Sequence, residues 1–269
     1  MIKSKNLRRV VYVVVGLIVI TLAMLFSLWF HYANKYNLVR EYIYDGHKDV
    51  YILGSIDKKH FSRFNNYSFE DLCNAITNIN PDLVIITCRK DHYDSHSVID
   101  GDIATCVSYA KCLEQDIPVK MVDWWMIDDS YPENATNELQ DDNMFIQISR
   151  ILKQVKPNTK TLFITDSHHF HQQATRFEVA GMKRNKLNDK SSIFKSHLED
   201  GQKFTYPPLA SKTWRDRVYF YAYTLSARLK AEQNLTGPLK DKYIDSDHEK
   251  FYKEEIKYCK YFINNRLYR

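Results

Sequence analysis

The sequence lacks the short motifs that mark several common enzyme classes. It contains no GxSxG nucleophile motif, no Walker phosphate-binding loop and no GxGxxG dinucleotide fingerprint. Its five cysteines include no CxxC pair, so a zinc-knuckle site has no support. An acidic stretch, DSDHEK at 245–250, lacks the glycine and the closing glutamate spacing of a calcium loop. A function must therefore be argued from residues that lie far apart in the chain.

Positive charge is scarce outside the N-terminus. The formal net charge is +5, but the first thirty residues carry +4 of it and the other 239 residues carry only +1. The chain has no basic stripe with interleaved aromatic residues of the kind that follows a phosphate backbone. We therefore expect no nucleic acid partner, and the sequence leaves the number of subunits open.

A long apolar run is present near the N-terminus. Residues 10–30 read VVYVVVGLIVITLAMLFSLWF without a charge, and roughly 20 apolar residues suffice to cross a bilayer as a helix. A cleaved signal peptide is the competing interpretation, but its apolar core is usually about 7–15 residues and ends at small residues. Here the run ends in the bulky sequence LWFHY, typical of an interfacial anchor. We predict an uncleaved transmembrane helix over residues 10–31, with the lipid bilayer as its partner.

The charges flanking this helix predict its orientation. Four basic residues and no acid precede the apolar run, and the positive-inside rule then places residues 1–9 in the cytoplasm. The rest of the chain is expected on the other side of the membrane. We predict a juxtamembrane connector over residues 32–48 and one folded domain over residues 49–269.

Short apolar runs alternate with helical patterns in the first part of that domain. Four runs are rich in β-formers, namely DVYILGS, PDLVIITC, IPVKMVDWW and TKTLFITDS, and each is followed by apolar residues at helical spacing. Ser68 and Asp71 are placed to cap the first of these helices. The alternation predicts an α/β fold with a mostly parallel sheet flanked by helices. Residues 212–232 and 247–266 also show helical patterns.

Polar residues gather after each predicted strand. In an open parallel sheet, ligands bind in the crevice beyond the carboxyl ends of the strands. The residues at that edge come from four segments: Asp57 and His60, then Thr87, Arg89, Asp91 and His92, then Asp123, Trp124 and Trp125, then Asp166, His168, His169 and His171. We predict that the functional site lies there.

Each residue also has a purely structural interpretation. Histidine is the commonest metal ligand and general base, but the histidines of TDSHHFHQQ also fit a solvated helix start. Asp57 and His60, three apart, would offer an oxygen and a nitrogen ligand to Zn²⁺ or Mn²⁺ from one face of a helical turn. A surface turn capped by Asp57 explains the same pair.

Three further residues are candidates for contact with a substrate. Arg89 directly follows a buried strand and is suited to a bidentate grip on a carboxylate or phosphate, although it can equally pair with Asp91. Asp123 closes the third strand and can orient a histidine. Trp124 is expected to form core or a pocket wall.

The cysteines divide into two groups. Cys73 and Cys88 lie in apolar periodic segments and are expected to be buried and unpaired. Cys106 and Cys112 are candidates for one disulfide if the domain lies outside the cell. The sequence does not decide whether they are joined.

The order of these motifs resembles the TraB/Tiki superfamily. The segments that carry the resemblance are VYILGSIDKKHF, INPDLVIITCRKDH, IPVKMVDWW and TLFITDSHHFHQQATRFEVAGM, and they span residues 49–185 behind a membrane anchor. That superfamily includes TraB and PrgY pheromone-shutdown proteins, GumN-like proteins and Tiki metalloproteases, with ChaN-like proteins and erythromycin esterase as remote relatives. The resemblance implies a metal-dependent hydrolase fold.

This chain departs from the family pattern at its polar positions. The first family strand ends in Gly-Thr-x-His, where this chain has Gly54, Ser55 and, in the histidine slot, Asp57. The second strand ends in a glutamate before an arginine; the arginine matches Arg89, but the glutamate slot falls on Thr87. A threonine cannot take up the proton of an attacking water near neutral pH.

The last motif of the resemblance assigns the remaining roles. The family's His-Phe pair matches His169 and Phe170. Family members to which activity is attributed use two histidines and the glutamate for metal binding and water activation. The resemblance thus implies His169, Asp57 and Arg89 as catalytic residues. It also implies a Zn²⁺ or Mn²⁺ ion held by Asp57, His60, His169 and His171.

Three functions follow as hypotheses, and the last of them is a membrane-tethered structural protein whose residues at the strand ends do not converge. The first is a membrane-anchored hydrolase, peptidase-like and metal-dependent, that acts on a peptide or secreted factor outside the cell. The second is a catalytically inactive protein on the same fold that binds a peptide or small molecule. In that case Arg89, Asp123 and Trp124 would make the contacts.

Overall fold

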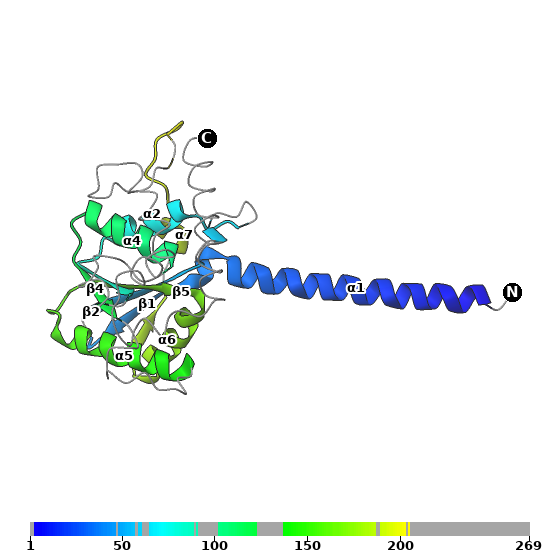
Figure 1. The fold of residues 1–269 in the computed structure, drawn as a ribbon, viewed down its shortest axis with the longest axis horizontal. Helices are drawn as coiled ribbons and strands as arrows, with labels where there is room; N and C mark the ends of the chain where they lie inside the picture. The colour runs from blue at the N-terminus through cyan, green and yellow to red at the C-terminus, as the bar shows by residue number, and fades with distance from the viewer. Residues whose placement is uncertain are drawn as a thin grey trace, which may run out of the picture.

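The predicted parallel sheet forms the centre of the domain, between two layers of helices (Figure 1). The computed structural model describes residues 3–46, 48–56, 59–60, 65–88, 90, 102–122, 137–186, 189–202 and 204. The helices predicted over residues 212–232 and 247–266 lie outside these ranges.

The sheet has six strands in the order β4-β3-β5-β2-β1-β6. Strands β4, β3, β5 and β2 run parallel to one another, whereas β1 runs antiparallel to both β2 and β6. The strand bounds are β1 Val39–Tyr44, β2 Lys48–Ser55, β3 Leu83–Thr87, β4 Val119–Val122, β5 Thr161–Asp166 and β6 Lys183–Asn185. The α/β prediction is therefore confirmed, and the four predicted strands are β2, β3, β4 and β5.

Helices cover both faces of the sheet. On one face lie α2 (Phe69–Ile79), α4 (Ile103–Glu114) and the short α7 (Lys190–Ile193); on the other lie α5 (Asn137–Gln154) and α6 (Ser167–Val179) (Figure 1). Ser68 begins α2 as predicted. Its hydroxyl accepts from the backbone N–H of Asp71 at 3.2 Å, and the Asp71 carboxylate accepts from the N–H of Ser68 at 2.9 Å. This capping box satisfies two donors at the start of the helix.

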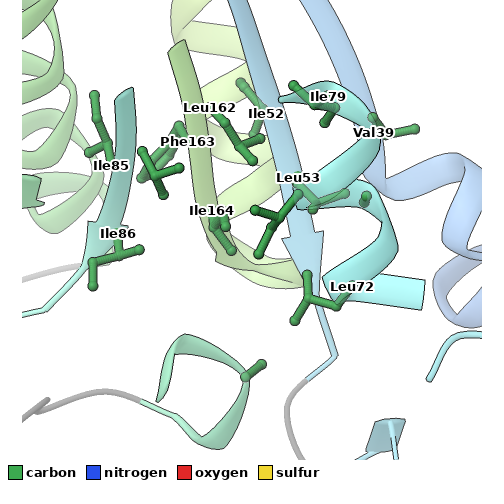
Figure 2. Close-up of a cluster of buried hydrophobic side chains, with 14 of the residues drawn as sticks. Val39, Ile52, Leu53, Leu72, Ile79, Ile85, Ile86, Leu162, Phe163 and Ile164 are labelled. Atoms are coloured by element: carbon green, nitrogen blue, oxygen red, sulfur yellow. The ribbon is translucent and has the colours of Figure 1, made fainter. Parts of the chain in front are cut away.

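The core lies on both faces of the parallel strands. Ile85, Ile86, Phe163 and Ile164 project from β3 and β5 beside Leu53 of β2 (Figure 2), and all five side chains are at most 1% exposed. Continuous apolar strands are the expected consequence of helices covering both faces of a parallel sheet.

The segment predicted as a connector, residues 32–48, contains part of the folded domain. It holds a 3-10 helix, η1 (Lys35–Leu38), followed by β1. The charges of Arg40 and Glu41 interrupt the apolar pattern of this strand, which is why the pattern did not predict it. In the structure Arg40 pairs with Glu178 at 3.2 Å, and the buried Glu41 accepts hydrogen bonds from Tyr51 and Asn185.

The N-terminal helix α1 (Lys3–Ala33) projects from the domain (Figure 1). The most apolar stretch of its segment Arg8–His31 has a mean hydropathy of 2.7, and none of that stretch is buried within the protein. The segment is long and apolar enough to cross a membrane. The side-chain amide of Asn37 in η1 donates to the backbone oxygen of His31 at 3.0 Å, so the end of α1 is capped directly by the domain.

The cysteines confirm one prediction and contradict another. Cys73 and Cys88 are buried and free, as expected. Cys106 and Cys112 are also free and buried, and both lie on α4. Six residues of α-helix separate two Cα atoms by about 9 Å along the axis, whereas a disulfide needs less than about 7 Å. The proposed bridge between them is therefore wrong.

One close contact joins β2 to η1 and α6 at Gly54. A Cβ atom added at Gly54 would lie 3.1 Å from Cβ and Cδ2 of Leu38 and 3.2 Å from Cγ of Phe170. Both neighbours are 0% exposed. Glycine thus allows η1 and α6 to approach the end of β2 more closely than any other residue would.

We predict that Gly54→Ala destabilises the protein by about 1–3 kcal/mol, because the added methyl forces apart side chains that have no free space. Urea unfolding of the full chain in detergent measures this change. Gly16→Ala is the matched control, since no atom lies within 4 Å of the added Cβ there. Equal stability of the Gly54→Ala protein and the wild type would contradict the prediction.

Candidate functional site

The carboxyl ends of the parallel strands meet at one edge of the sheet. There Ser55, the last residue of β2, lies beside Asp166, the last residue of β5, in the strand register. The Ser55 hydroxyl donates to Oδ2 of Asp102, which begins α4, at 3.2 Å. Residues from three segments of the sequence therefore converge at this edge.

Several predicted site residues lie outside the described part of the chain. These are Asp57, Arg89, Asp123 and Trp124. Their predicted roles stay predictions. The described candidates are His60, His169 and His171, and the structure places them in three different environments.

His169 lies at the start of α6, between two carboxylates. Its Nδ1 is 3.0 Å from Oδ1 of Asp141 on α5, and its Nε2 is 3.8 Å from Oδ2 of Asp166. A carboxylate only accepts hydrogen bonds, so Nδ1 carries the proton and donates it to Asp141. Nε2 has no hydrogen-bond partner in the described residues, and it is the ring atom left for chemistry.

The local sequence explains why His169 is held there. Asp166 ends β5 and caps α6: its Oδ1 accepts from the backbone N–H groups of His168 and His169 at 2.7 and 3.0 Å. The turn from strand to helix is therefore immediate, and it leaves His169 in the first turn above the end of the sheet. A carboxylate at this position also complements the positive end of the helix dipole.

Asp141 is the buried support of this histidine. Its side chain is 1% exposed, and Gln173 on α6 donates from Nε2 to both its Oδ1 and its backbone oxygen at 2.8 Å. Two buried acceptors, Oδ2 of Asp141 and Oε1 of Gln173, have no hydrogen-bond partner within the described residues. Buried polar atoms are normally paired with protein or water, so this small polar cluster has capacity for another donor.

The two carboxylates decide the charge of His169. Burial alone would lower its pKa, but the hydrogen bond to Asp141 and the charges of Asp166 and Asp141 outweigh burial and the opposing charge of Arg176. The pKa of His169 is therefore raised above its ordinary value. An imidazole of this kind takes up a proton readily near neutral pH, as a general base must.

His60 has a structural role in this fold. The ring is 3% exposed; its Nε2 accepts from the backbone N–H of Ile56 at 3.0 Å, and Nδ1 lies 3.0 Å from the backbone oxygen of Tyr67 and donates to it. Burial lowers the pKa of His60 to about 3. With both ring nitrogens bonded to the backbone, His60 would have to give up one of these bonds to bind a metal ion.

His171 lies on the other side of α6 from His169. Residues two apart on a helix do not face each other. The His171 ring stacks on His31, the last residue of the apolar segment of α1, with centroids 6.5 Å apart. Burial, together with the charges of Arg40 and His31, lowers the pKa of His171. In this structure α6 does not bring His169 and His171 to the same point in space.

The sequence analysis missed Asp141, although a signal for it exists. Asp141 lies three, seven and eleven residues before the buried Met144, Ile148 and Leu152 of α5. It therefore occupies the apolar face of an amphipathic helix. A carboxylate in such a position needs a buried partner, and that requirement pointed to a histidine or a cation elsewhere in the fold.

The described residues fit part of a metal site. Nε2 of His169 and the Asp166 carboxylate offer one nitrogen and one oxygen ligand, and Asp141 behind Nδ1 is the usual support of a metal-binding histidine. Within the described residues no group of three histidine, cysteine or acidic side chains forms a complete set. A third ligand would have to come from residues such as Asp57.

Comparisons with protein-family models, with curated proteins and with solved structures find no match to this chain.

We predict that His169 and His60 respond differently to pH. With ¹³C-labelled histidine, the Cε1 signal of His169 should titrate with a midpoint above about 6.5, while that of His60 should not move between about pH 5 and 8. Single His→Gln variants assign the signals. A His60 midpoint near 6.5 would contradict the buried, neutral ring.

The same shifts predict opposite effects on stability. Protonation of His60 favours unfolding, so its contribution is complete above about pH 6.5 and is lost as the pH falls towards about 3. Protonation of His169 favours folding, so its contribution is complete below about pH 6.5 and is lost as the pH rises through its raised pKa.

Asp141→Asn removes one carboxylate and should move the midpoint of the His169 titration downward. An unchanged midpoint would show that Asp141 does not set the charge of His169.

Proposed function

We propose that the protein is a membrane-anchored, extracytoplasmic hydrolase of the TraB/Tiki type that acts on a peptide or secreted factor, with His169 as its proton-transfer residue. The observation that carries the proposal is the hydrogen bond from His169 to the buried Asp141 at the carboxyl edge of the sheet. A histidine oriented by a buried carboxylate, with its second nitrogen directed outward, is the arrangement required of a general base.

The environment of His169 supports proton transfer from a water molecule. Its tautomer is set by Asp141, so the lone pair of the neutral ring lies on Nε2. Proton uptake at Nε2 places positive charge near Asp166 and Asp141, which stabilise it. After the proton is taken up, the same atom can return it to a leaving group.

A divalent metal ion would be the alternative use of the same ring atom, because Nε2 has one lone pair and cannot bind a metal ion and take up a proton at once. Zn²⁺ or Mn²⁺ would be held by His169 and Asp166, with Asp57 as the ligand that the family resemblance adds. Such an ion would lower the pKa of a bound water and polarise a carbonyl. Asp166 would then keep capping the helix through Oδ1 and would bind the ion through Oδ2, the oxygen that faces His169.

A catalytically inactive binding protein is the second candidate. Two observations favour it: the family's glutamate position holds Thr87, and His60 is occupied by the backbone of Ile56 and Tyr67. On this hypothesis a peptide or small ligand would bind at the same edge, in contact with Arg89, Asp123 and Trp124.

The membrane anchor is part of the proposal. The exposed apolar side chains of α1 need a cover, and large apolar surfaces exposed to water are rare in soluble proteins. Phe26, Trp29 and Phe30 pack together at the end of α1 next to the domain. Aromatic side chains gather at membrane–water interfaces, which supports a position of this end of α1 at the bilayer surface.

We predict that the full chain, purified in detergent without added metal, cleaves a quenched fluorescent peptide library, and that any bound Zn²⁺ or Mn²⁺, about one per molecule, depends on His169. His169→Gln should remove the metal and lower the cleavage rate by at least about 100-fold. Elemental analysis and fluorescence measure the two effects.

His168→Gln is the matched control, because His168 is the exposed neighbour of His169 on the same helix turn. Cleavage without metal would assign His169 as a metal-independent base. A third outcome is a folded protein that shows neither metal nor cleavage and still binds peptide in the presence of a chelator. That result would overturn the hydrolase and support the binding protein.

We also predict the orientation of the chain. Lys3, Lys5, Arg8 and Arg9 should keep the N-terminus in the cytoplasm, so alkaline phosphatase fused after Arg269 should be active. Replacement of the four basic residues by glutamine should lower that activity. The prediction of an extracytoplasmic domain would be contradicted if the phosphatase fusion is inactive and a second fusion, to a reporter that fluoresces only in the cytoplasm, is fluorescent.

A further inference from the structure

A basic pocket lies at the edge of the sheet, away from His169. Its volume is about 260 Å³, and it is formed by β1, β6 and the start of α7. The residues that line it are Val39, Arg40, Glu41, Arg184, Asn185, Lys186 and Lys190. Four of these seven side chains are cationic and one is acidic.

The single acid does not neutralise the pocket. The carboxylate of Glu41 accepts from the Tyr51 hydroxyl at 2.7 Å and from the Asn185 amide at 3.0 Å, and it points to the face of β1 opposite Arg40, because successive side chains of a strand alternate between the two faces. Arg184, Lys186 and Lys190 have no ion-pair partner among the described residues. These three cations line the pocket and outnumber its one carboxylate, so the site favours an anion.

Arg40 is held by contacts with α6. One of its nitrogens bonds to Glu178 at 3.2 Å, and its guanidinium lies over the ring of Phe170, 5.5 Å from the centroid. The ion pair with Glu178 uses one of the five N–H donors of the guanidinium, and others remain for a ligand oxygen.

The pocket lies at the end of the domain that joins α1. Val39 at the start of β1 pairs with Leu53 near the carboxyl end of β2, because the two strands are antiparallel. Beside Phe170, His171 stacks on His31 at the end of the apolar segment. Arg40 is thus separated from the end of α1 by one layer of side chains.

The length of α1 gives the height of the pocket relative to a bilayer. The uncharged run at 10–30 spans about 31 Å as a helix, which equals the roughly 30 Å hydrocarbon core. The polar headgroup layer adds about 5–7 Å on each side. His31 then enters that layer, and Arg40 lies within or next to it.

We infer that this pocket binds the phosphate of an anionic phospholipid headgroup. The guanidinium groups of Arg40 and Arg184 suit the oxygens of a phosphodiester, and Lys186 and Lys190 add point charges. Basic side chains at a membrane surface are attracted to anionic lipids. The inference rests on the membrane anchor of the proposed function and is independent of the chemistry at His169.

The test uses the full chain in a neutral detergent. The thermal unfolding midpoint is measured as dioctanoyl phosphatidylglycerol, dioctanoyl phosphatidylcholine or inorganic phosphate is added. Phosphatidylglycerol should raise the midpoint in a saturable way, because a ligand of the folded state stabilises it. The variant Arg184→Gln, Lys186→Gln, Lys190→Gln should bind it at least about tenfold more weakly.

The matched control removes three cations from another part of the domain, in Lys120→Gln, Lys153→Gln, Lys156→Gln. These lysines are exposed, and no ion pair within the described residues involves them. The control should respond like the wild type. Equal affinity of the pocket variant and the wild type, or no preference for phosphatidylglycerol over phosphatidylcholine, would overturn the inference. An equal response to inorganic phosphate would assign the pocket to the free anion and overturn the lipid.

Alkaline carbonate extraction of membranes separates this result from a failure of the anchor. A chain released by carbonate would refute the anchor, and with it the reason for a lipid ligand. A chain that stays in the membrane and shows no phosphatidylglycerol binding would refute the pocket alone.

Discussion

The close packing of Leu38 and Phe170 on Gly54 is the contact on which the rest of the arrangement depends. Leu38 ends the 3-10 helix that follows α1, and Phe170 lies in the helix that carries His169. Because β2 has no side chain at Gly54, both elements rest directly on its backbone. The contact sets the position of the N-terminal helix and of the candidate site relative to the same strand. A change there would shift both together.

Three histidines of one protein have acquired three different chemistries from their surroundings. His60 is enclosed by backbone groups and stays neutral, the pKa of His169 is raised by two acids, and the pKa of His171 is lowered by burial and by Arg40 and His31. Residue type alone therefore says little about function. The helix period separates His169 from His171, so that one of them faces two acids and the other faces Arg40 and His31.

Much of the fold could be predicted from the sequence, because the signals were local. Short apolar runs and helical spacing predicted β2 to β5 and the helices between them, and Ser68 with Asp71 predicted the start of α2. β1 was missed because Arg40 and Glu41 find their partners, Glu178 and Asn185, more than 130 residues away.

The candidate site was predicted less completely than the fold. The edge of the sheet and His169 could be inferred, since polar residues followed each strand. The apolar face of α5 indicates that Asp141 is buried, but its partner depends on how α5 packs against α6, and no local pattern identifies His169 as that partner. The bonds of His60 reach Ile56 and Tyr67, four and seven residues away, but they form in a segment without a helix or strand period that could predict them.

The antiparallel strand β1 has a mechanical consequence for the chain. It follows α1 after only a few residues and is hydrogen-bonded on both sides, with six residue pairs to β2 and three to β6. The bonds between antiparallel strands run perpendicular to them. A force that pulls the domain away from α1 along β1 therefore loads these bonds together, in shear, instead of opening them one after another. The sheet transmits tension from its N-terminal helix through the two strands that flank β1.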